Sequence, residues 1–361
     1  MTRTRLRGTA LGVVTIFALA TVLPAPASAQ PRQQPVEWTA LGDSYTAGVF
    51  VGDPQPPLGS SDRDGCDRTT NSYPDVVNRA FEADPPAGRP VNLTNVSCGN
   101  ATITEIAADR QIPISPVQPP GDGWPSVAPQ VNRAGIGAQT DVITIGVGGN
   151  SLPVGKIVPA CLFAGIGQPD EATPCRDAYE AGGPFLDPES IYDKYDRITR
   201  QYAAMLRAVH QTAPHAKVIT VGYPTIFPDD PTTCDRRDTT ELAAQIKGFG
   251  LVSVTHGDIA WLNEVITHLN AIIRAVTELA GDTYVDTATS SKGHDVCQPS
   301  SVKWVEGICG HAREYWPTEL ELGPLTLECS GGTRATIVHP NAAGHAKTAA
   351  RVETTIRAAL N

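Results

Sequence analysis

Short runs of apolar residues alternate along the chain with longer segments in which apolar residues recur every three or four positions. The short runs are typical of strands buried on both faces of a parallel sheet. The longer segments are typical of helices that turn one apolar face toward a core. The pattern predicts strands at residues 36–41, 91–96, 142–147, 218–222 and 283–285, and helices at residues 73–83, 191–210, 258–279 and 340–360.

This alternation predicts an α/β fold, in which helices cover both faces of a five-stranded parallel sheet and form a three-layer sandwich. The remaining long segments carry no clear period and are predicted as loops, and loops of such length usually have a functional role. No internal repeat and no break in composition marks a boundary, so residues 30–361 are predicted to form a single domain. The predicted loops are residues 111–130, 151–189, 224–257 and 287–338.

The first 29 residues have the pattern of a secretory signal peptide. Three arginines precede an uncharged apolar stretch at residues 10–23, and Ala27-Ser28-Ala29 resembles a cleavage site. We therefore expect a secreted, extracellular protein. Removal of the three arginines would change the net charge from −10 to −13. Such a charge argues against a nucleic-acid partner and allows at most transient contact with neutral or zwitterionic lipid surfaces.

Eight cysteines fit an oxidising compartment, where disulfides hold long loops in place. They include no C-x-x-C pair, which argues against a zinc site or a redox dithiol. Sequence alone allows 105 pairings. Closure of local loops favours the pairs Cys66–Cys98, Cys161–Cys175, Cys234–Cys297 and Cys309–Cys329.

Two residues could form a nucleophile and its base. Ser44 follows the first predicted strand within Gly42-Asp43-Ser44, at the sheet edge where ligands bind in open α/β folds. Taken alone, a helix cap is as good an explanation of this serine. His339 comes just before Pro340 and the last predicted helix, where an imidazole can act as a general base. Taken alone, this histidine fits a surface or capping residue better.

Glycine and asparagine follow the second and third predicted strands. Gly99 comes after the second strand, and Gly149-Asn150 comes after the third. A glycine N–H and an asparagine side chain can both donate hydrogen bonds to an oxyanion. Taken alone, Gly99 and Gly149-Asn150 are each explained better by a tight turn.

The order of these serine, glycine, asparagine and histidine positions resembles the four sequence blocks of the SGNH (GDSL) hydrolase family. The resemblance extends over nearly the whole chain after the signal peptide, and the cysteine-rich loops look most like the secreted actinobacterial esterases and lipases. It implies a flavodoxin-like sheet, with Ser44 as nucleophile and His339 as base. It also implies an oxyanion hole formed by the Ser44 N–H, the Gly99 N–H and the Asn150 side chain.

Two positions depart from the family pattern. Thr336 stands where the family usually has the aspartate that orients the histidine. Some secreted members use a main-chain carbonyl instead, so we expect a Ser44–His339 dyad in which the Thr336 carbonyl accepts a hydrogen bond from His339 Nδ1. Ser151 stands where an aspartate often follows the asparagine, and we expect this change to be tolerated because the donor is Asn150.

The resemblance implies a serine ester hydrolase that cleaves lipid-like acyl esters through an acyl-enzyme, with no metal and no cofactor. We expect a monomer. Three alternatives remain open. Trp124, Trp304 and Trp316 in the predicted loops could stack on sugars, as in a carbohydrate-ester deacetylase. A dry pocket would favour transfer of the acyl group to another alcohol. Because Thr336 replaces the usual aspartate, a non-catalytic binding protein on the same scaffold is the third alternative.

Overall fold

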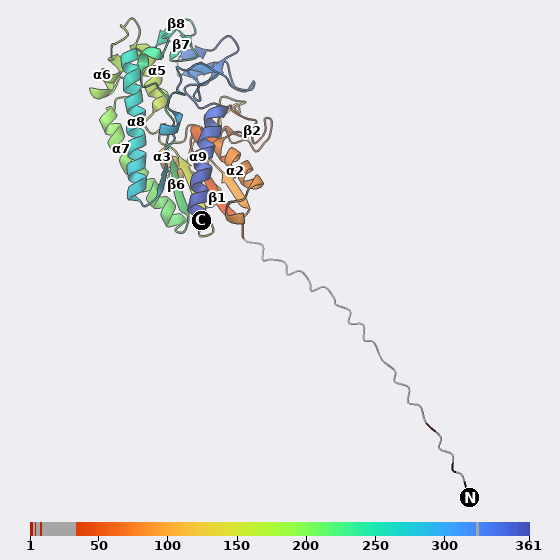
Figure 1. Ribbon diagram of the computed structural model, residues 1–361. Helices are drawn as coiled ribbons and strands as arrows, with labels where there is room; N and C mark the ends of the chain where they lie inside the picture. Colours follow the sequence, from red (N-terminus) through yellow and green to blue (C-terminus); the bar gives the residue numbers. More distant parts are fainter. Residues whose placement is uncertain (3, 5–7, 9–33, 323–324) are drawn as a thin grey trace. The chain divides into compact units, whose positions relative to one another are not determined.

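The computed structural model describes residues 1–2, 4, 8, 34–322 and 325–361, and its ribbon is drawn in Figure 1. The predicted signal peptide lies almost entirely outside the described residues. Residues 34–361 form one compact unit.

A five-stranded sheet forms the centre of this unit, and all of its strand pairs are parallel. The strand order is β4-β1-β5-β6-β9, so β1 lies between β4 and β5. The α/β class and the five parallel strands predicted from the sequence are confirmed. The strands are β1 (Val36–Gly42), β4 (Val91–Asn95), β5 (Val142–Gly146), β6 (Lys217–Val221) and β9 (Thr283–Val285).

Helices cover both faces of the sheet, as Figure 1 shows. Alternate residues of β1 explain this layering, because successive side chains of a strand point to opposite faces. Trp38 and Ala40 pack toward α2 and α9, whereas Leu41 packs with α3, α7 and α8. The helices are α1 (Ser44–Ala47), α2 (Tyr73–Ala83), α3 (Ile103–Ala107), α4 (Gln130–Ala134), α5 (Val154–Ala164), α6 (Pro174–Glu180), α7 (Ile191–Thr212), α8 (His256–Leu279) and α9 (Ala342–Leu360).

The segments predicted as loops contain more structure than the sequence pattern indicates. Helices α5 and α6 occupy part of residues 151–189, and a second, antiparallel sheet has the order β11-β12-β7-β8. These elements are short, and α5 has Pro159 in its interior, so their periodicity is weak. The additional strands are β2 (Pro54–Gln55), β3 (Arg68–Thr69), β7 (Ala243–Ile246), β8 (Gly250–Ser253), β10 (Cys309–Gly310), β11 (Glu319–Leu322), β12 (Leu325–Glu328) and β13 (Arg334–Ala335), with 3-10 turns η1 (Pro86–Gly88), η2 (Pro231–Thr233) and η3 (Thr289–Ser291).

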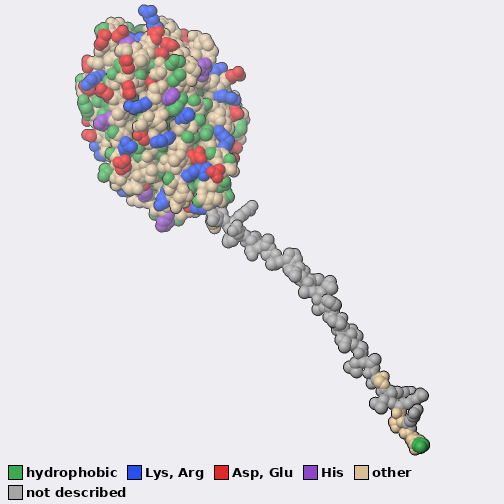
Figure 2. Space-filling model, viewed as in Figure 1, with side chains coloured by type: hydrophobic (Ala, Val, Ile, Leu, Met, Phe, Trp, Pro, Cys, Tyr) green, Lys and Arg blue, Asp and Glu red, His purple; other side chains and the backbone are tan. Residues whose placement is uncertain are grey.

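Four disulfides hold the long segments in place. The bonded pairs are Cys66–Cys98, Cys161–Cys175, Cys234–Cys297 and Cys309–Cys329, the same local pairs that loop closure favours. Within the described residues, no helix has both the length and the hydrophobicity needed to cross a bilayer. On the face seen in Figure 2, basic side chains are scattered among acidic ones and form no continuous basic patch.

Candidate active site

The strand order brings three polar loops together at one edge of the sheet. Ser44 follows β1, Gly99 and Asn100 follow β4, and Asn150 follows β5. Because β1 lies between the other two strands, Ser44 lies between the loops that carry the glycine and the asparagines. The chain leaves β1 toward β4 on one side and returns to β5 on the other, which is the kind of switch point where open α/β sheets bind ligands.

The turn that carries Ser44 is sharp, and only glycine fits at position 42, where the turn begins. Gly42 has φ 154°, and a Cβ at this position would collide with the Gly146 carbonyl and with the Thr46 side chain. Asp43 caps the short helix α1 by accepting a hydrogen bond from the Tyr45 N–H at 2.9 Å. Burial raises the pKa of Asp43 to about 7. The turn therefore holds Ser44 at a fixed place on the sheet edge.

Ser44 and His339 are in direct contact. His339 Nε2 lies 2.8 Å from Ser44 Oγ. On the other side of the ring, Nδ1 lies 2.9 Å from the Thr336 carbonyl oxygen and 2.7 Å from the Ile337 carbonyl oxygen. A carbonyl can only accept a hydrogen bond, so Nδ1 carries the proton in the neutral ring. The unprotonated Nε2 is then ready to accept the Ser44 hydroxyl proton.

The backbone just before His339 adopts an unusual conformation. Ile337 has φ 43° and Val338 has φ 53°, a region that β-branched residues rarely enter. Their N–H groups donate to the Ile308 and Gly307 carbonyls at 3.0 and 2.9 Å, which holds the segment in place. This backbone turns two carbonyls toward the same imidazole nitrogen. Such strain persists where the surrounding structure enforces it, and it is concentrated at functional sites.

Burial lowers the pKa of His339 below its ordinary value of 6.5, and the two carbonyl hydrogen bonds oppose this shift. The neutral imidazole, which is the form able to act as a base, is therefore favoured near neutral pH. His345, six residues further along the chain and within α9, has a different environment. It is buried, its Nδ1 accepts a hydrogen bond from the Tyr73 N–H at 3.2 Å, and burial lowers its pKa to about 3.

Gly99, which the sequence suggests as an oxyanion donor, lies in the loop after β4. Its N–H donates to the Cys66 carbonyl at 2.9 Å and is therefore already engaged, although Gly99 does line the cleft beside Ser44. The next residue, Asn100, also lines the cleft and has φ 64°. Among the residues that the structure describes, the Asn100 N–H has no acceptor, and the same is true of the Ser44 N–H. Asn100 is thus the better candidate for the donor from this loop.

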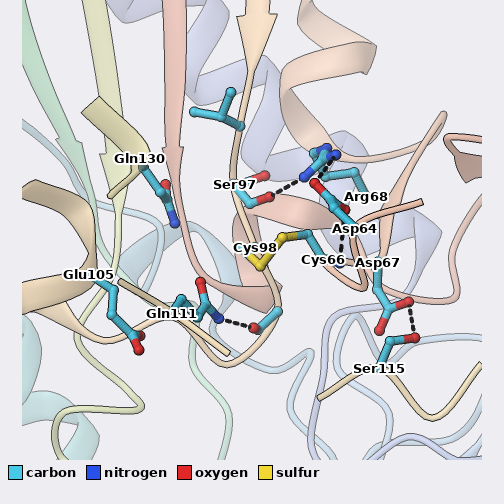
Figure 3. The surroundings of a disulfide bond; sticks show 12 residues. Asp64, Cys66, Asp67, Arg68, Ser97, Cys98, Glu105, Gln111, Ser115 and Gln130 are labelled. Atoms are coloured by element: carbon cyan, nitrogen blue, oxygen red, sulfur yellow. Dashed lines mark hydrogen bonds and ion pairs between the residues drawn. A yellow bond between two sulfur atoms is a disulfide. The ribbon is translucent and has the colours of Figure 1, made fainter. Parts of the chain in front are cut away.

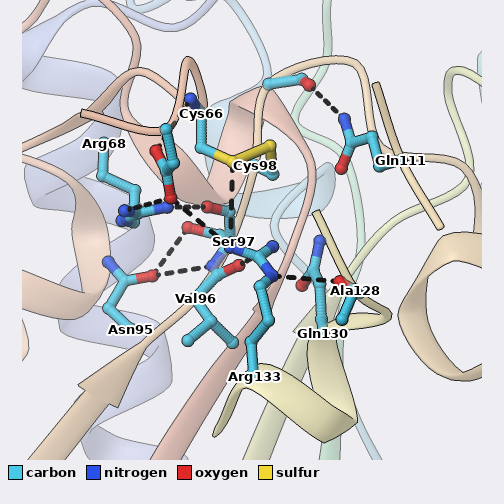
Figure 4. Close-up of polar contacts among 12 residues, drawn as sticks. Cys66, Arg68, Asn95, Val96, Ser97, Cys98, Gln111, Ala128, Gln130 and Arg133 are labelled. Carbon is cyan, nitrogen blue, oxygen red and sulfur yellow. Dashed lines mark hydrogen bonds and ion pairs between the residues drawn. A yellow bond between two sulfur atoms is a disulfide. The ribbon is translucent and has the colours of Figure 1, made fainter. Parts of the chain in front are cut away.

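The loop around Gly99 is held from several sides. Figure 3 shows the Cys66–Cys98 disulfide next to it and the Gln111 side chain, whose Nε2 donates to the Gly99 carbonyl at 2.7 Å. Figure 4 shows the residues between β4 and this loop, where the Arg133 guanidinium donates to the Val96 carbonyl at 2.8 Å. These contacts restrict the position of the loop before any substrate binds.

Asn150 completes the set of polar groups. Its Nδ2 donates to the Ala101 carbonyl at 3.0 Å, and because an amide nitrogen carries two protons, one N–H remains for another acceptor. The neighbouring Ser151 accepts a hydrogen bond at its Oγ from the Ile103 N–H at 2.9 Å. The loops after β4 and β5 are therefore linked to each other on either side of Ser44.

An open cleft of about 500 Å³ leads to Ser44 and His339. This volume lies within the range of about 300–1,000 Å³ typical of small-molecule sites. Its walls are largely apolar and include Val49, Phe50, Ile114, Pro116, Trp316, Leu320 and Ile337. A smaller pocket of about 60 Å³ lies beside the same two residues and is lined by Val154, Ile226, Ile266 and Val338, among others.

The sequence pattern does not reveal several residues of this site. Tyr223 follows β6 and contacts Asp43, but a tyrosine after a strand carries no specific signal except its place at the carboxyl edge. An asparagine after a strand is a weak signal for Asn100, because asparagine adopts the left-handed conformation more readily than most residues in any turn. The Ile337 carbonyl is a main-chain group and has no signal of its own.

A serine hydroxyl in contact with a histidine, at the carboxyl edge of a parallel sheet, is the arrangement found in hydrolases that use a serine nucleophile. The model of the GDSL-like lipase/acylhydrolase family matches residues 40–347, and the chain belongs to this family. The resemblance to GDSL hydrolases seen in the sequence is thereby confirmed, and the protein is a carboxylic-ester hydrolase.

Among its relatives is Lipase 2 of Streptomyces coelicolor, which is 32% identical over 297 residues, covering 81% of this chain and 83% of the relative. An esterase of Streptomyces scabiei is 25% identical over 373 residues, covering 98% of this chain and 95% of the relative. The crystal structure of phospholipase A1 from Streptomyces albidoflavus NA297 shares the fold. Its TM-score is 0.55 at 18% identity, with 90% of this chain and 99% of that chain covered.

Proposed function

We propose that the protein is a secreted hydrolase of lipid-like acyl esters, with Ser44 as nucleophile and His339 as general base. The observation that carries this proposal is the 2.8 Å contact between Ser44 Oγ and His339 Nε2 in a cleft with apolar walls. The names of its relatives, lipase and esterase, agree with an acyl ester substrate.

In this mechanism, Ser44 Oγ attacks the ester carbonyl carbon while His339 Nε2 takes the hydroxyl proton. The imidazolium that forms is stabilised by the Thr336 and Ile337 carbonyls at Nδ1. His339 then gives the proton to the leaving alcohol, and an acyl-enzyme remains on Ser44. Water, deprotonated by His339, attacks this acyl group, and the acid is released.

The tetrahedral intermediate carries a negative oxygen that needs hydrogen-bond donors. We assign this role to the Ser44 N–H, the Asn150 side chain and the Asn100 N–H. The assignment to Asn100 replaces Gly99, whose N–H donates to the Cys66 carbonyl. The strand order β4-β1-β5 supports it, because it brings these three loops to the same edge of the sheet.

The cleft favours a lipid-like acyl group over a sugar. A sugar site needs an exposed aromatic face, and Trp316 is the one tryptophan among the described residues that line the cleft. Trp316 is only 8% exposed, its ring packs 5.5 Å from that of Phe50, and its Nε1 donates to the Ala335 carbonyl at 2.8 Å. The ring is thus part of the apolar wall, and an acyl chain is its natural partner.

Secretion is supported by two features. Four disulfides are characteristic of extracellular proteins. The first 29 residues have the order of charges and apolar positions found in signal peptides. N-terminal sequencing of the protein recovered from the culture medium should begin at Gln30, and a protein retained inside cells with Met1 intact would refute this part.

The activity is tested by hydrolysis of p-nitrophenyl esters from C2 to C16 with the oxidised protein. Ser44→Ala should abolish turnover at every chain length, while Ser290→Ala, an exposed serine after β9, should retain it. A rate maximum at C8 or longer supports the proposal. A maximum at C2 would favour a carbohydrate-ester deacetylase, and no Ser44-dependent turnover would favour a binding protein. Product analysis in the presence of glycerol distinguishes hydrolysis from acyl transfer.

A further inference from the structure

Tyr223 lines the small pocket beside Ser44 and His339, and it contacts two loops of the site. The residue follows β6, is 4% exposed, and has no place in the mechanism described above. Its hydroxyl accepts a hydrogen bond from the Gly149 N–H at 2.7 Å. The same hydroxyl donates to Asp43 Oδ2. A single side chain thus connects the residue before Asn150 with the residue before Ser44.

Asp43 is an acceptor for two donors that approach from different elements. Its Oδ1 accepts from the Tyr45 N–H at 2.9 Å, and its Oδ2 accepts from the Tyr223 hydroxyl. Asp43 is 1% exposed, so these contacts replace the water that a carboxylate would otherwise bind. The turn of Ser44 and the loop of Asn150 are therefore connected through one hydroxyl and one carboxylate.

Tyr223 is itself held firmly. Asn270, on the 24-residue helix α8, accepts from the Tyr223 N–H at 2.8 Å and donates to the Tyr223 carbonyl at 2.9 Å. The ring packs edge to face on Tyr45, with centroids 5.0 Å apart. A Cβ at position 149 would lie 3.3 Å from the Tyr223 hydroxyl oxygen, so the absence of a side chain at Gly149 permits the close approach.

We propose that Tyr223 is a positioning residue for the oxyanion hole. By fixing the distance between Gly149 and Asp43, its hydroxyl sets where the Asn150 amide lies relative to Ser44. The inference rests on the proposed function, because it concerns the donor that stabilises the negative oxygen formed during attack by Ser44. Asn150 touches the reacting atoms, and Tyr223 acts through it.

The principal test is Tyr223→Phe, which removes one hydroxyl and retains the ring. Loss of the hydroxyl leaves the Gly149 N–H without its acceptor and Asp43 without one donor. Because a displacement of about 1 Å in a catalytic group can cost about 10²-fold in rate, we expect kcat to fall about 10- to 100-fold. KM should change less than twofold, because the walls of the cleft are intact.

The matched control is Tyr202→Phe. Tyr202 lies in α7, it is fully buried, and its hydroxyl has no hydrogen-bond partner among the described residues. Its removal deletes the same atom from the interior without touching the site, so kcat should stay within threefold of the wild-type value. Thermal unfolding of both variants shows whether a change in kcat follows from a loss of stability.

A second variant keeps the test decisive if Tyr223→Phe does not fold. Asp43→Asn retains the volume and the capping oxygen, since asparagine is a good helix cap. With the amide oxygen still accepting from the Tyr45 N–H, the amide nitrogen would face the Tyr223 hydroxyl, whose proton would lose its carboxylate acceptor. We expect kcat to fall about as much as in Tyr223→Phe. The double variant, Asp43→Asn with Tyr223→Phe, should have a kcat no lower than that of the less active single variant.

The outcomes separate this inference from the proposed function. A kcat of Tyr223→Phe within threefold of wild type overturns it, as does a rise in KM with unchanged kcat. Additive losses in the double variant also overturn it, because the two groups then act independently. If Ser44→Ala remains active, the proposed function fails first. Loss of activity in Ser44→Ala with full activity in Tyr223→Phe refutes only the role of Tyr223.

Discussion

The replacement Thr336→Ala tests most directly how His339 is oriented. In the structure, His339 Nδ1 contacts the carbonyls of Thr336 and Ile337, and no described carboxylate is bonded to the imidazole. The alanine variant loses the threonine side chain and keeps the carbonyl. Because the group that accepts from Nδ1 survives, kcat should stay within about threefold of wild type.

The structure also gives the stability cost of this change. Thr336 is 1% exposed, and its Oγ1 donates to the Gly307 carbonyl at 2.9 Å. Removal of a hydrogen bond costs about 0.5–1.5 kcal/mol and removal of a buried methyl group about 0.8 kcal/mol. The Gly307 carbonyl keeps a second donor, the Val338 N–H at 2.9 Å, so no acceptor is left without a partner. We expect a loss of about 2 kcal/mol in the free energy of unfolding.

The assay combines urea unfolding with kcat on p-nitrophenyl octanoate, at a temperature where every variant is folded. Thr336→Ser is the matched control, because serine retains the hydroxyl and loses only the methyl group. It should lose about 1 kcal/mol of stability and no activity. Removal of a residue that orients a catalytic histidine costs about 10⁴-fold in kcat. A loss of 10³-fold or more in folded Thr336→Ala, with active Thr336→Ser, would therefore show that the threonine hydroxyl orients His339.

Three further outcomes are expected. Asn150→Ala should lower kcat by about 10²–10³-fold with little change in KM, as for loss of one oxyanion donor, and a loss below fivefold would remove Asn150 from that role. Since burial lowers the pKa of His339 and the neutral ring is the active base, kcat/KM should rise with pH and reach half its maximum below pH 6.5; a midpoint above pH 7 would contradict this. Replacing Cys66 and Cys98 by alanine opens a loop of 32 residues, which corresponds to about 3.7 kcal/mol of stability in urea unfolding. The same variant should lose kcat, because the disulfide fixes the segment whose Cys66 carbonyl accepts from the Gly99 N–H in the oxyanion loop; unchanged kcat would show that the loop keeps its position without the disulfide.

Predictability from the sequence differs between the central sheet and the segments around it. The strand at residues 36–41 and the helix at residues 73–83 are found within a residue of their predicted bounds, because both have a continuous apolar run or a clear apolar period. Helix α5 and the sheet of β7 and β8 lie in predicted loops. Their residues are buried by contacts with distant parts of the chain, and this is information that a local pattern does not contain.

The candidate site shows the same division. Ser44 and His339 stand out in the sequence because their neighbours, Gly42-Asp43-Ser44 and His339-Pro340, form recognisable motifs. The proposal of Asn100 in place of Gly99 as donor rests on the structure, because it depends on where the Cys66 carbonyl lies. Both residues are of a type that can supply an N–H group, and the sequence does not tell which N–H group is already occupied.

By itself, the sequence determined the class of fold, the order of the polar loops and the family. These properties follow from local periodicity and from residue types at strand ends, which adjacent residues specify. Only the tertiary structure decided that Tyr223 lies between Gly149 and Asp43, and that the Ile337 carbonyl faces His339 Nδ1 beside that of Thr336. The Tyr223–Asp43 contact joins residues 180 positions apart, and it arises from the parallel sheet that brings the strand ends together. The second carbonyl at His339 depends on the positive φ values of Ile337 and Val338, which the sequence pattern does not show.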